Sequence, residues 1–141
     1  MAKRQVDVHL VSDSTGDMIE RIARACLCQF GEIEARQRLW PFVNRPQKVE
    51  QVLAGIAEQP GIVLCSLLDQ ELRRSMRQGC QAMGLACIDV LGPVLQGLAR
   101  HLRRQASNRP GKQHRMDAEY FARVEAMQRA FLNEIRRELK Q

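Results

Sequence analysis

The feature that most constrains the fold of this chain is a regular alternation of short apolar runs and amphipathic helical patterns. Four runs have the length and composition of β-strands and lie at residues 6–11, 34–40, 62–67 and 86–91. Apolar residues at helical spacing follow each run, at residues 17–30, 46–59, 69–83 and 93–105. Strands that alternate with helices along a chain form a parallel sheet with helices on both faces. The pattern therefore predicts an α/β fold with a four-stranded parallel sheet.

The third run is apolar on both faces, which is typical of a central strand in such a sheet. We expect the strand order 2-1-3-4, which places the reversal of strand order between the first and third strands. We also expect residues 1–106 to form a Rossmann-like domain and residues 107–116 a basic loop. Residues 117–141 are expected to form a long helix that packs on the domain or on a second subunit.

The five cysteines indicate a reduced protein rather than a disulfide framework. Their number is odd, and the sequence has no Cys-x-x-Cys pair and no His/Cys cluster. Cys26 and Cys28 fall in the first predicted helix, whose residues at helical spacing are Met18, Ile22, Ala25, Cys26 and Gln29 or Phe30. We predict buried thiols in a cytoplasmic protein without a metal site. No apolar run approaches the ~20 residues that cross a bilayer, and we expect no signal peptide.

A small polar loop, Ser12-Asp13-Ser14-Thr15-Gly16, separates the first strand from the first helix. In α/β proteins this junction binds phosphates and nucleotides, because free backbone N–H groups and the helix dipole point at the anion. The predicted strand order brings Asp69 and Asp89 to the same edge of the sheet. We predict a site there for phosphate, ADP or ATP. The competing interpretation is that these residues only cap helices, which is the favoured role of Asp69.

The net charge of +6 is concentrated in one segment. Residues 1–91 carry 11 Lys and Arg against 11 Asp and Glu, whereas residues 92–141 carry 11 against 5. Between Gly92 and Met116 there are six bases and no acid. Nucleic acid, an acidic partner protein or a phosphorylated ligand fits this segment, and so does a solvated linker with a basic helix end. An aromatic content of only 4% argues against stacking on single-stranded nucleic acid.

Two longer motifs carry more information than these local patterns. The first is His9-Leu10-Val11-Ser12-Asp13-Ser14-Thr15-Gly16, and the second contains His114-Arg115-Met116-Asp117-Ala118-Glu119-Tyr120-Phe121-Ala122-Arg123. Between them lie Leu39-Trp40-Pro41 and Asp89-Val90-Leu91-Gly92-Pro93. Together these segments resemble the regulatory protein of pyruvate,phosphate dikinase and phosphoenolpyruvate synthase, a bifunctional Ser/Thr kinase and phosphate-dependent pyrophosphorylase.

The resemblance covers residues 6–127 and implies the N-terminal domain of that family. It places the family motif near the active site of the family's second half, with functional residues at His114, Arg115, Asp117, Tyr120 and Arg123. That second half carries a Gly- and Ser/Thr-rich phosphate loop with a Lys, and this sequence contains no such loop. Phosphoryl transfer needs a phosphate cradle, a metal site and a base. We therefore assign no catalytic residue and expect no phosphoryl transfer by this chain alone.

Three functions remain open. The favoured one is a regulatory module that binds pyruvate,phosphate dikinase or phosphoenolpyruvate synthase, self-associates, or holds phosphate or nucleotide at Ser12–Gly16. The second is an active ADP-dependent Ser/Thr kinase and pyrophosphorylase. The third, and least favoured, is a nucleic-acid-binding module that uses Arg100 to Arg115. Without a partner domain, the apolar face from Phe121 to Leu139 is expected to be covered in a helix-mediated homodimer.

Overall fold

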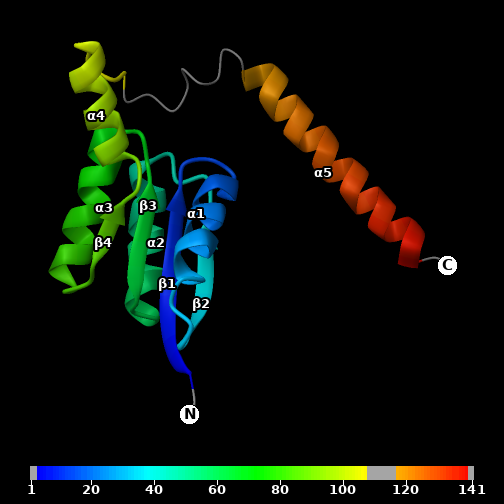
Figure 1. Cartoon of the computed structure of the whole chain (residues 1–141), viewed down its shortest axis with the longest axis horizontal. Helices are drawn as coiled ribbons and strands as arrows, with labels where there is room; N and C mark the ends of the chain where they lie inside the picture. The colour runs from blue at the N-terminus through cyan, green and yellow to red at the C-terminus, as the bar shows by residue number, and fades with distance from the viewer. Residues whose placement is uncertain (1–2, 108–116, 140–141) are drawn as a thin grey trace. The chain divides into compact units, whose positions relative to one another are not determined.

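The computed structural model describes residues 3–107 and 117–139, and the chain divides into two units. The first unit extends to Asn108 and holds the sheet with its covering helices (Figure 1). The second begins at Arg109 and contains the helix α5 (Asp117–Leu139). The long helix predicted for residues 117–141 is present and begins at the predicted residue, and residues 140–141 lie outside the described residues.

The first unit is built on a four-stranded parallel sheet in the order β2-β1-β3-β4. Its strands are β1 (Arg4–Ser12), β2 (Ile33–Trp40), β3 (Ile62–Ser66) and β4 (Cys87–Asp89). Both the α/β class and the strand order predicted from the sequence are confirmed. β4 is shorter than the predicted run 86–91, since its pairing with β3 extends only from Val63–Cys87 to Cys65–Asp89.

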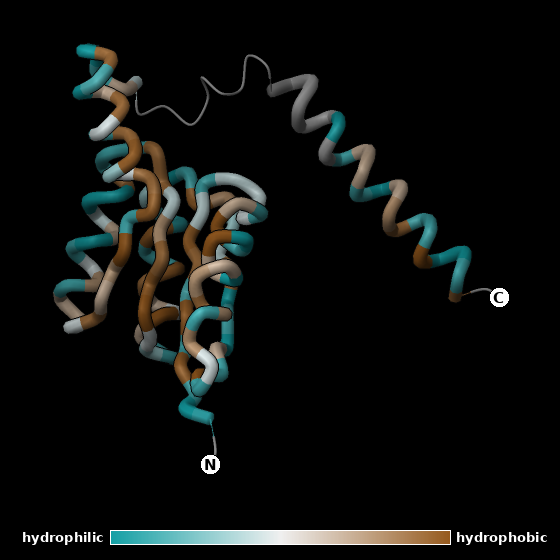
Figure 2. Tube along the Cα trace, viewed as in Figure 1, coloured by the Kyte–Doolittle hydropathy of each residue, from teal (hydrophilic) through white to brown (hydrophobic). Residues whose placement is uncertain are grey.

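Helices cover both faces of this sheet. α1 (Asp17–Leu27) packs on one face, where Ile19 and Ala23 meet Val8 and Leu10 of β1. α2 (Pro46–Glu58) and α3 (Gln70–Ala82) pack on the other face, over a larger core built from alternate residues of the strands. Figure 2 shows hydrophobic residues along the central strands and hydrophilic residues interspersed on the helices. The helices lie on opposite faces because the order of the strands reverses at β1. α1 leads from β1 to β2 on one side, and α2 leads back from β2 past β1 to β3.

The sheet contains one buried histidine whose two ring nitrogens are both hydrogen-bonded. The Nε1–H of Trp40 donates to Nδ1 of His9 over 3.1 Å, and Nε2 of His9 lies 2.7 Å from the carbonyl oxygen of Gln59. Because the indole is only a donor, Nδ1 must be the acceptor and Nε2 carries the proton. The Trp40 ring also lies directly over Gly55, where an added Cβ would clash with Cη2 of the indole.

The predicted buried face of α1 is wrong. Met18 and Phe30 are 46% and 59% exposed, whereas Ile19 and Ala23 are fully buried. The apolar residues of this short helix are spread around its circumference, and contact with the sheet selects the stripe that begins at Ile19. The prediction of buried thiols also fails for Cys26 and Cys28, which are exposed at the C-terminal end of α1.

Two helices carry apolar side chains that are exposed within their own units. On α4 (Gly92–Leu102) these are Val94, Leu98 and Leu102, which recur every fourth residue and are 58%, 52% and 61% exposed. On α5 they are Met127, Phe131, Leu132, Ile135 and Leu139. In the described part of the chain, no helix is both long enough and apolar enough to span a membrane.

Candidate functional site

The polar loop after β1 lies at the carboxyl edge of the sheet, beside the end of β3. Ser12 pairs with Ser66 in the strand register, and both side chains are buried. The Ser14 N–H donates to Oγ of Ser12 over 3.0 Å, and the loop carbonyls of Ser12 and Ser14 accept from the backbone N–H groups of Val43 and Phe42. The loop is therefore a fixed turn held against the segment that follows β2.

Asp13 joins the loops at the reversal of strand order, because its Oδ2 accepts a hydrogen bond of 2.9 Å from the Leu68 N–H. Asp69 caps α3, since its Oδ1 accepts from the N–H groups of Glu71 and Leu72 over 2.9 and 3.1 Å. The structure thus brings Ser12–Gly16 and Asp69 to one edge, as predicted. Capping, the role favoured for Asp69, is confirmed by this geometry.

α1 begins directly after this loop, and its N-cap residue supplies no side-chain cap. Its N-cap is Gly16 with φ of 94°, where a Cβ would come within 2.5 Å of the Leu39 side chain. Thr15 Oγ1 lies 3.4 Å from the Asp17 N–H. The helix therefore presents its positive end at the sheet edge, although Asp17 and Glu20 in its first turn already complement the dipole.

Phe42 is a residue of this edge that the sequence did not indicate. Its backbone lies in the left-handed region, with φ of 56°, and the residue is 48% exposed. A left-handed conformation is costly for a bulky residue and is held here by the hydrogen bond of 2.9 Å from its N–H to the Ser14 carbonyl. The hydrogen bond thus holds an exposed aromatic residue beside the polar loop.

Asp89 connects the end of β4 to two helices. Its Oδ1 accepts from the N–H groups of Leu91 and Gly92 over 3.1 and 2.9 Å, which caps the start of α4. Its Oδ2 lies 3.1 Å from Nη1 of Arg73, and Nη2 of Arg73 also contacts the Leu68 carbonyl over 3.4 Å. The carboxylate predicted as a ligand-binding group is therefore engaged with the protein.

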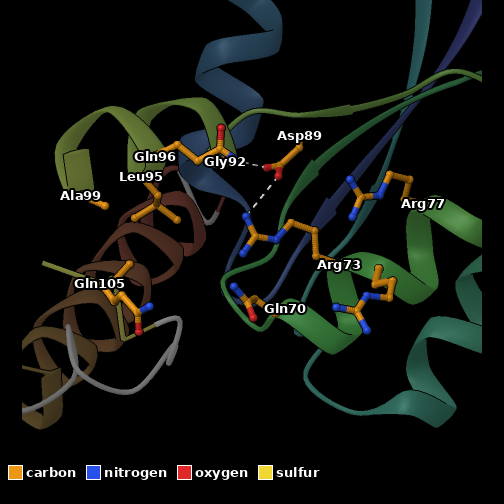
Figure 3. A pocket seen from close by; sticks show the side chains of 11 residues that line it. Gln70, Arg73, Arg77, Asp89, Gly92, Leu95, Gln96, Ala99 and Gln105 are labelled. Atoms are coloured by element: carbon orange, nitrogen blue, oxygen red, sulfur yellow. Dashed lines mark hydrogen bonds and ion pairs between the residues drawn. The ribbon is translucent and has the colours of Figure 1, made fainter.

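Arg73 and Asp89 line a pocket between α3 and α4 with a volume of about 490 Å³ (Figure 3). Arg74 and Arg77 of α3 also line it, with glutamines from three segments and the apolar Leu95 of α4. This basic group was not predicted, because the excess of positive charge in the sequence lies after Gly92. The signal was present as Arg73-Arg74-x-x-Arg77, a spacing that gathers three cations along one side of a helix.

Three cysteines from separate elements meet in the core beside α3. Cys65 of β3 and Cys80 of α3 are buried, and Cys87 of β4 is half-buried against the same core. Hydrogen bonds from the Cys65 and Cys80 thiols lower the pKa of Cys87, and the nearby Arg77 guanidinium lowers it further. The same bonds, together with burial, raise the pKa of Cys65 and Cys80.

The family motif is only partly within the described residues. His114 and Arg115 lie outside them, and the same holds for the side chains of Asp117 and Tyr120. Arg123 is exposed on α5. Within residues 3–107 and 117–139, no group of three His, Cys, Asp or Glu side chains is arranged to hold a metal ion.

The fold and its carboxyl edge define a doubly wound α/β domain of the class that places binding sites at the reversal of strand order. Residues 8–134 match the kinase/pyrophosphorylase family model. The chain belongs to this kinase/pyrophosphorylase family.

Relatives named pyruvate, phosphate dikinase regulatory protein support the same assignment. The protein of Rhizorhabdus wittichii is 41% identical over 124 residues, which are 88% of this chain and 45% of that protein. The protein of Paramagnetospirillum magneticum is 42% identical over 121 residues, which are 86% of this chain and 39% of that protein. The protein of Rhodospirillum rubrum is 37% identical over 127 residues, which are 90% of this chain and 46% of that protein. The chain therefore spans less than half the length of the curated relatives it matches.

Proposed function

We propose that this chain is a regulatory binding module that acts on pyruvate, phosphate dikinase in the cytoplasm. The names of its relatives support the choice of partner. The observation that carries the proposal is the apolar stripe of α4, formed by Val94, Leu98 and Leu102, which stays more than half exposed. Such a stripe at helical spacing is typical of a helix that docks into a groove of another protein.

Self-association is the second part of the proposal. α5 exposes five large apolar side chains along 23 residues. A second copy of the same helix offers a matching apolar surface, and a two-fold axis lets each copy cover the other. We propose a homodimer formed through α5.

The third part is a phosphate or nucleotide site at Ser12–Gly16. It is supported by the start of α1, where the N-cap Gly16 supplies no side-chain cap, and by the exposed Phe42 beside the loop, whose ring suits stacking on a base. The phosphate group would meet the N–H groups of the first turn of α1. Asp17 and Glu20 lie in the same turn and oppose anion binding, so we expect weak affinity.

Binding to pyruvate, phosphate dikinase is tested by biolayer interferometry with immobilised wild-type chain and a Leu98→Glu variant. We expect at least tenfold weaker binding of the variant, because the new carboxylate would be buried in an apolar contact. The control is Gln51→Glu on α2, which adds the same charge at an exposed position and should bind like the wild type. Equal binding of all three chains, or no binding by any, would contradict the proposal.

The loop site is tested by thermal shift with ADP and with phosphate. Thr15→Asp places a negative charge in front of α1 and keeps an oxygen acceptor near the Asp17 N–H, so the fold should survive while the ligand-induced shift disappears. Gly16 is a poor choice of variant, because any Cβ there meets Leu39. Gln51→Glu again serves as control, and a full shift in Thr15→Asp would refute this site.

A further inference from the structure

The pocket between α3 and α4 has the composition of a site for a small anion rather than of an apolar cleft. Its walls carry three arginines and three glutamines, and its apolar surface comes mainly from α4. Figure 3 shows Gln70 and Arg73 on one side of the cavity, with Leu95, Ala99 and Gln105 on the other. The volume of about 490 Å³ lies within the range of roughly 300–1,000 Å³ that holds small-molecule ligands.

The positive charge in this pocket exceeds the negative charge. Asp89 is its one lining carboxylate among the described residues, and that group is already paired with Arg73 over 3.1 Å. In the same part of the chain, Arg74 and Arg77 make no ion pair with a carboxylate, and Arg77 interacts electrostatically with the Cys87 thiol. Arg74 and Arg77 are also three residues apart on one helix, where like charges repel each other. A bound anion would relieve this repulsion.

The geometry of Arg73 makes it suitable for recognition. Its side chain is only 14% exposed, and its contacts with Asp89 and the Leu68 carbonyl hold the guanidinium in one position. Arginine donors fixed in this way bind phosphate oxygens with less loss of side-chain freedom than mobile surface cations do. The amides of Gln70, Gln96 and Gln105 supply donors and acceptors for a polar organic group.

We propose that this pocket binds a small phosphate monoester, with the phosphate at Arg73, Arg74 and Arg77 and the organic part against the glutamines. The site is separate from the Ser12–Gly16 loop and does not depend on it. The shared chemistry is a dianionic phosphate, and the size of the cavity favours an ester over the free ion.

The test is isothermal titration of the full chain with ribose 5-phosphate, with inorganic phosphate and with uncharged ribose. We expect the ester to bind most tightly, the free ion more weakly, and ribose not at all. In an Arg74→Gln/Arg77→Gln variant the dissociation constant for the ester should rise at least tenfold. Both positions are exposed on α3 and glutamine is a good helix former, so the fold is retained.

Two control variants distinguish binding in this pocket from binding elsewhere on the chain. Arg21→Gln/Arg24→Gln on α1 removes the same charge from another helix and should leave the affinity unchanged, since both arginines are exposed there. Thr15→Asp should also bind the ester normally. Equal affinity of the Arg74→Gln/Arg77→Gln variant and the wild type would overturn the proposal, as would loss of binding in Thr15→Asp or no binding of the ester by the wild type.

Discussion

The carboxylate of Asp13 accepts a hydrogen bond of 2.9 Å from the backbone N–H of Leu68, 55 residues further along the chain. One residue follows β1 and the other follows β3, so the bond connects the loops on the two sides of the strand-order reversal. It fixes the separation of the polar loop from the start of α3, and hence from Arg73 and the pocket.

Asp13→Ala should lower the free energy of unfolding by about 1–3 kcal/mol, because the Leu68 N–H loses a charged acceptor at a partly buried position. The measurement is urea denaturation followed by circular dichroism. Glu50→Ala is the matched control, since it removes a carboxylate from an exposed position of α2 and should change stability little. Equal stability of both variants would show that the loop connection is unimportant to the fold.

Two glycine-to-alanine substitutions in helices should have opposite effects. Alanine favours helix by about 1 kcal/mol over glycine. At Gly97 of α4 nothing lies within 4 Å of the new Cβ, so Gly97→Ala should raise the helix content or the melting temperature slightly. At Gly55 of α2 the Cβ would clash with the Trp40 ring, so Gly55→Ala should lower the melting temperature. Thermal melts of the two variants test the prediction, which fails if both change in the same direction.

The pH dependence of stability should contain a contribution from Cys87. Its pKa is lower in the folded chain than the ordinary value of 9.0, so between these two values the unfolded chain binds more protons. Stability therefore rises with pH in that window and is lost as the pH falls towards the pKa of the folded chain. Above the ordinary value the trend reverses, since Cys65 and Cys80 have raised pKa values and stay protonated only in the folded chain.

This contribution is measured by urea denaturation of wild type and Cys87→Ala at about pH 6 and about pH 8. The stability advantage of the wild type should be larger at the higher pH. Cys28→Ala, at an exposed position, should follow the wild type at both values. An advantage that is constant or shrinks with rising pH would disprove the assignment.

Phe131→Glu on α5 should shift the chain from dimer to monomer, because a carboxylate cannot be buried in an apolar contact without a partner. Phe131 is 64% exposed within its own unit, so the helix itself should be retained. Light scattering after size-exclusion chromatography gives the mass. Asn133→Glu adds the same charge on the opposite side of α5 and should remain a dimer. A strictly monomeric wild type at high concentration would exclude the homodimer.

Much of the fold was predictable because the spacing of apolar residues reflects local geometry. The run at residues 62–67, which is apolar on both faces, identified β3 as a central strand. The strand order followed from the helical connections between successive strands. The position of Ser12–Gly16 beside the end of β3 followed from the same order. The buried face of α1 was not predictable, since its apolar residues lie on more than one side and only the sheet selects Ile19 and Ala23.

The sequence by itself determined the α/β class, the order of the strands and the place of the polar loop, because periodicity and chain connectivity are properties of neighbouring residues. The tertiary structure alone decided the contacts between distant residues. It placed the indole of Trp40 on His9, and it gathered Cys65, Cys80 and Cys87 from three elements. It also formed the pocket that Arg73 lines together with residues of α4. Such contacts depend on the packing of whole elements against each other, which no local pattern specifies.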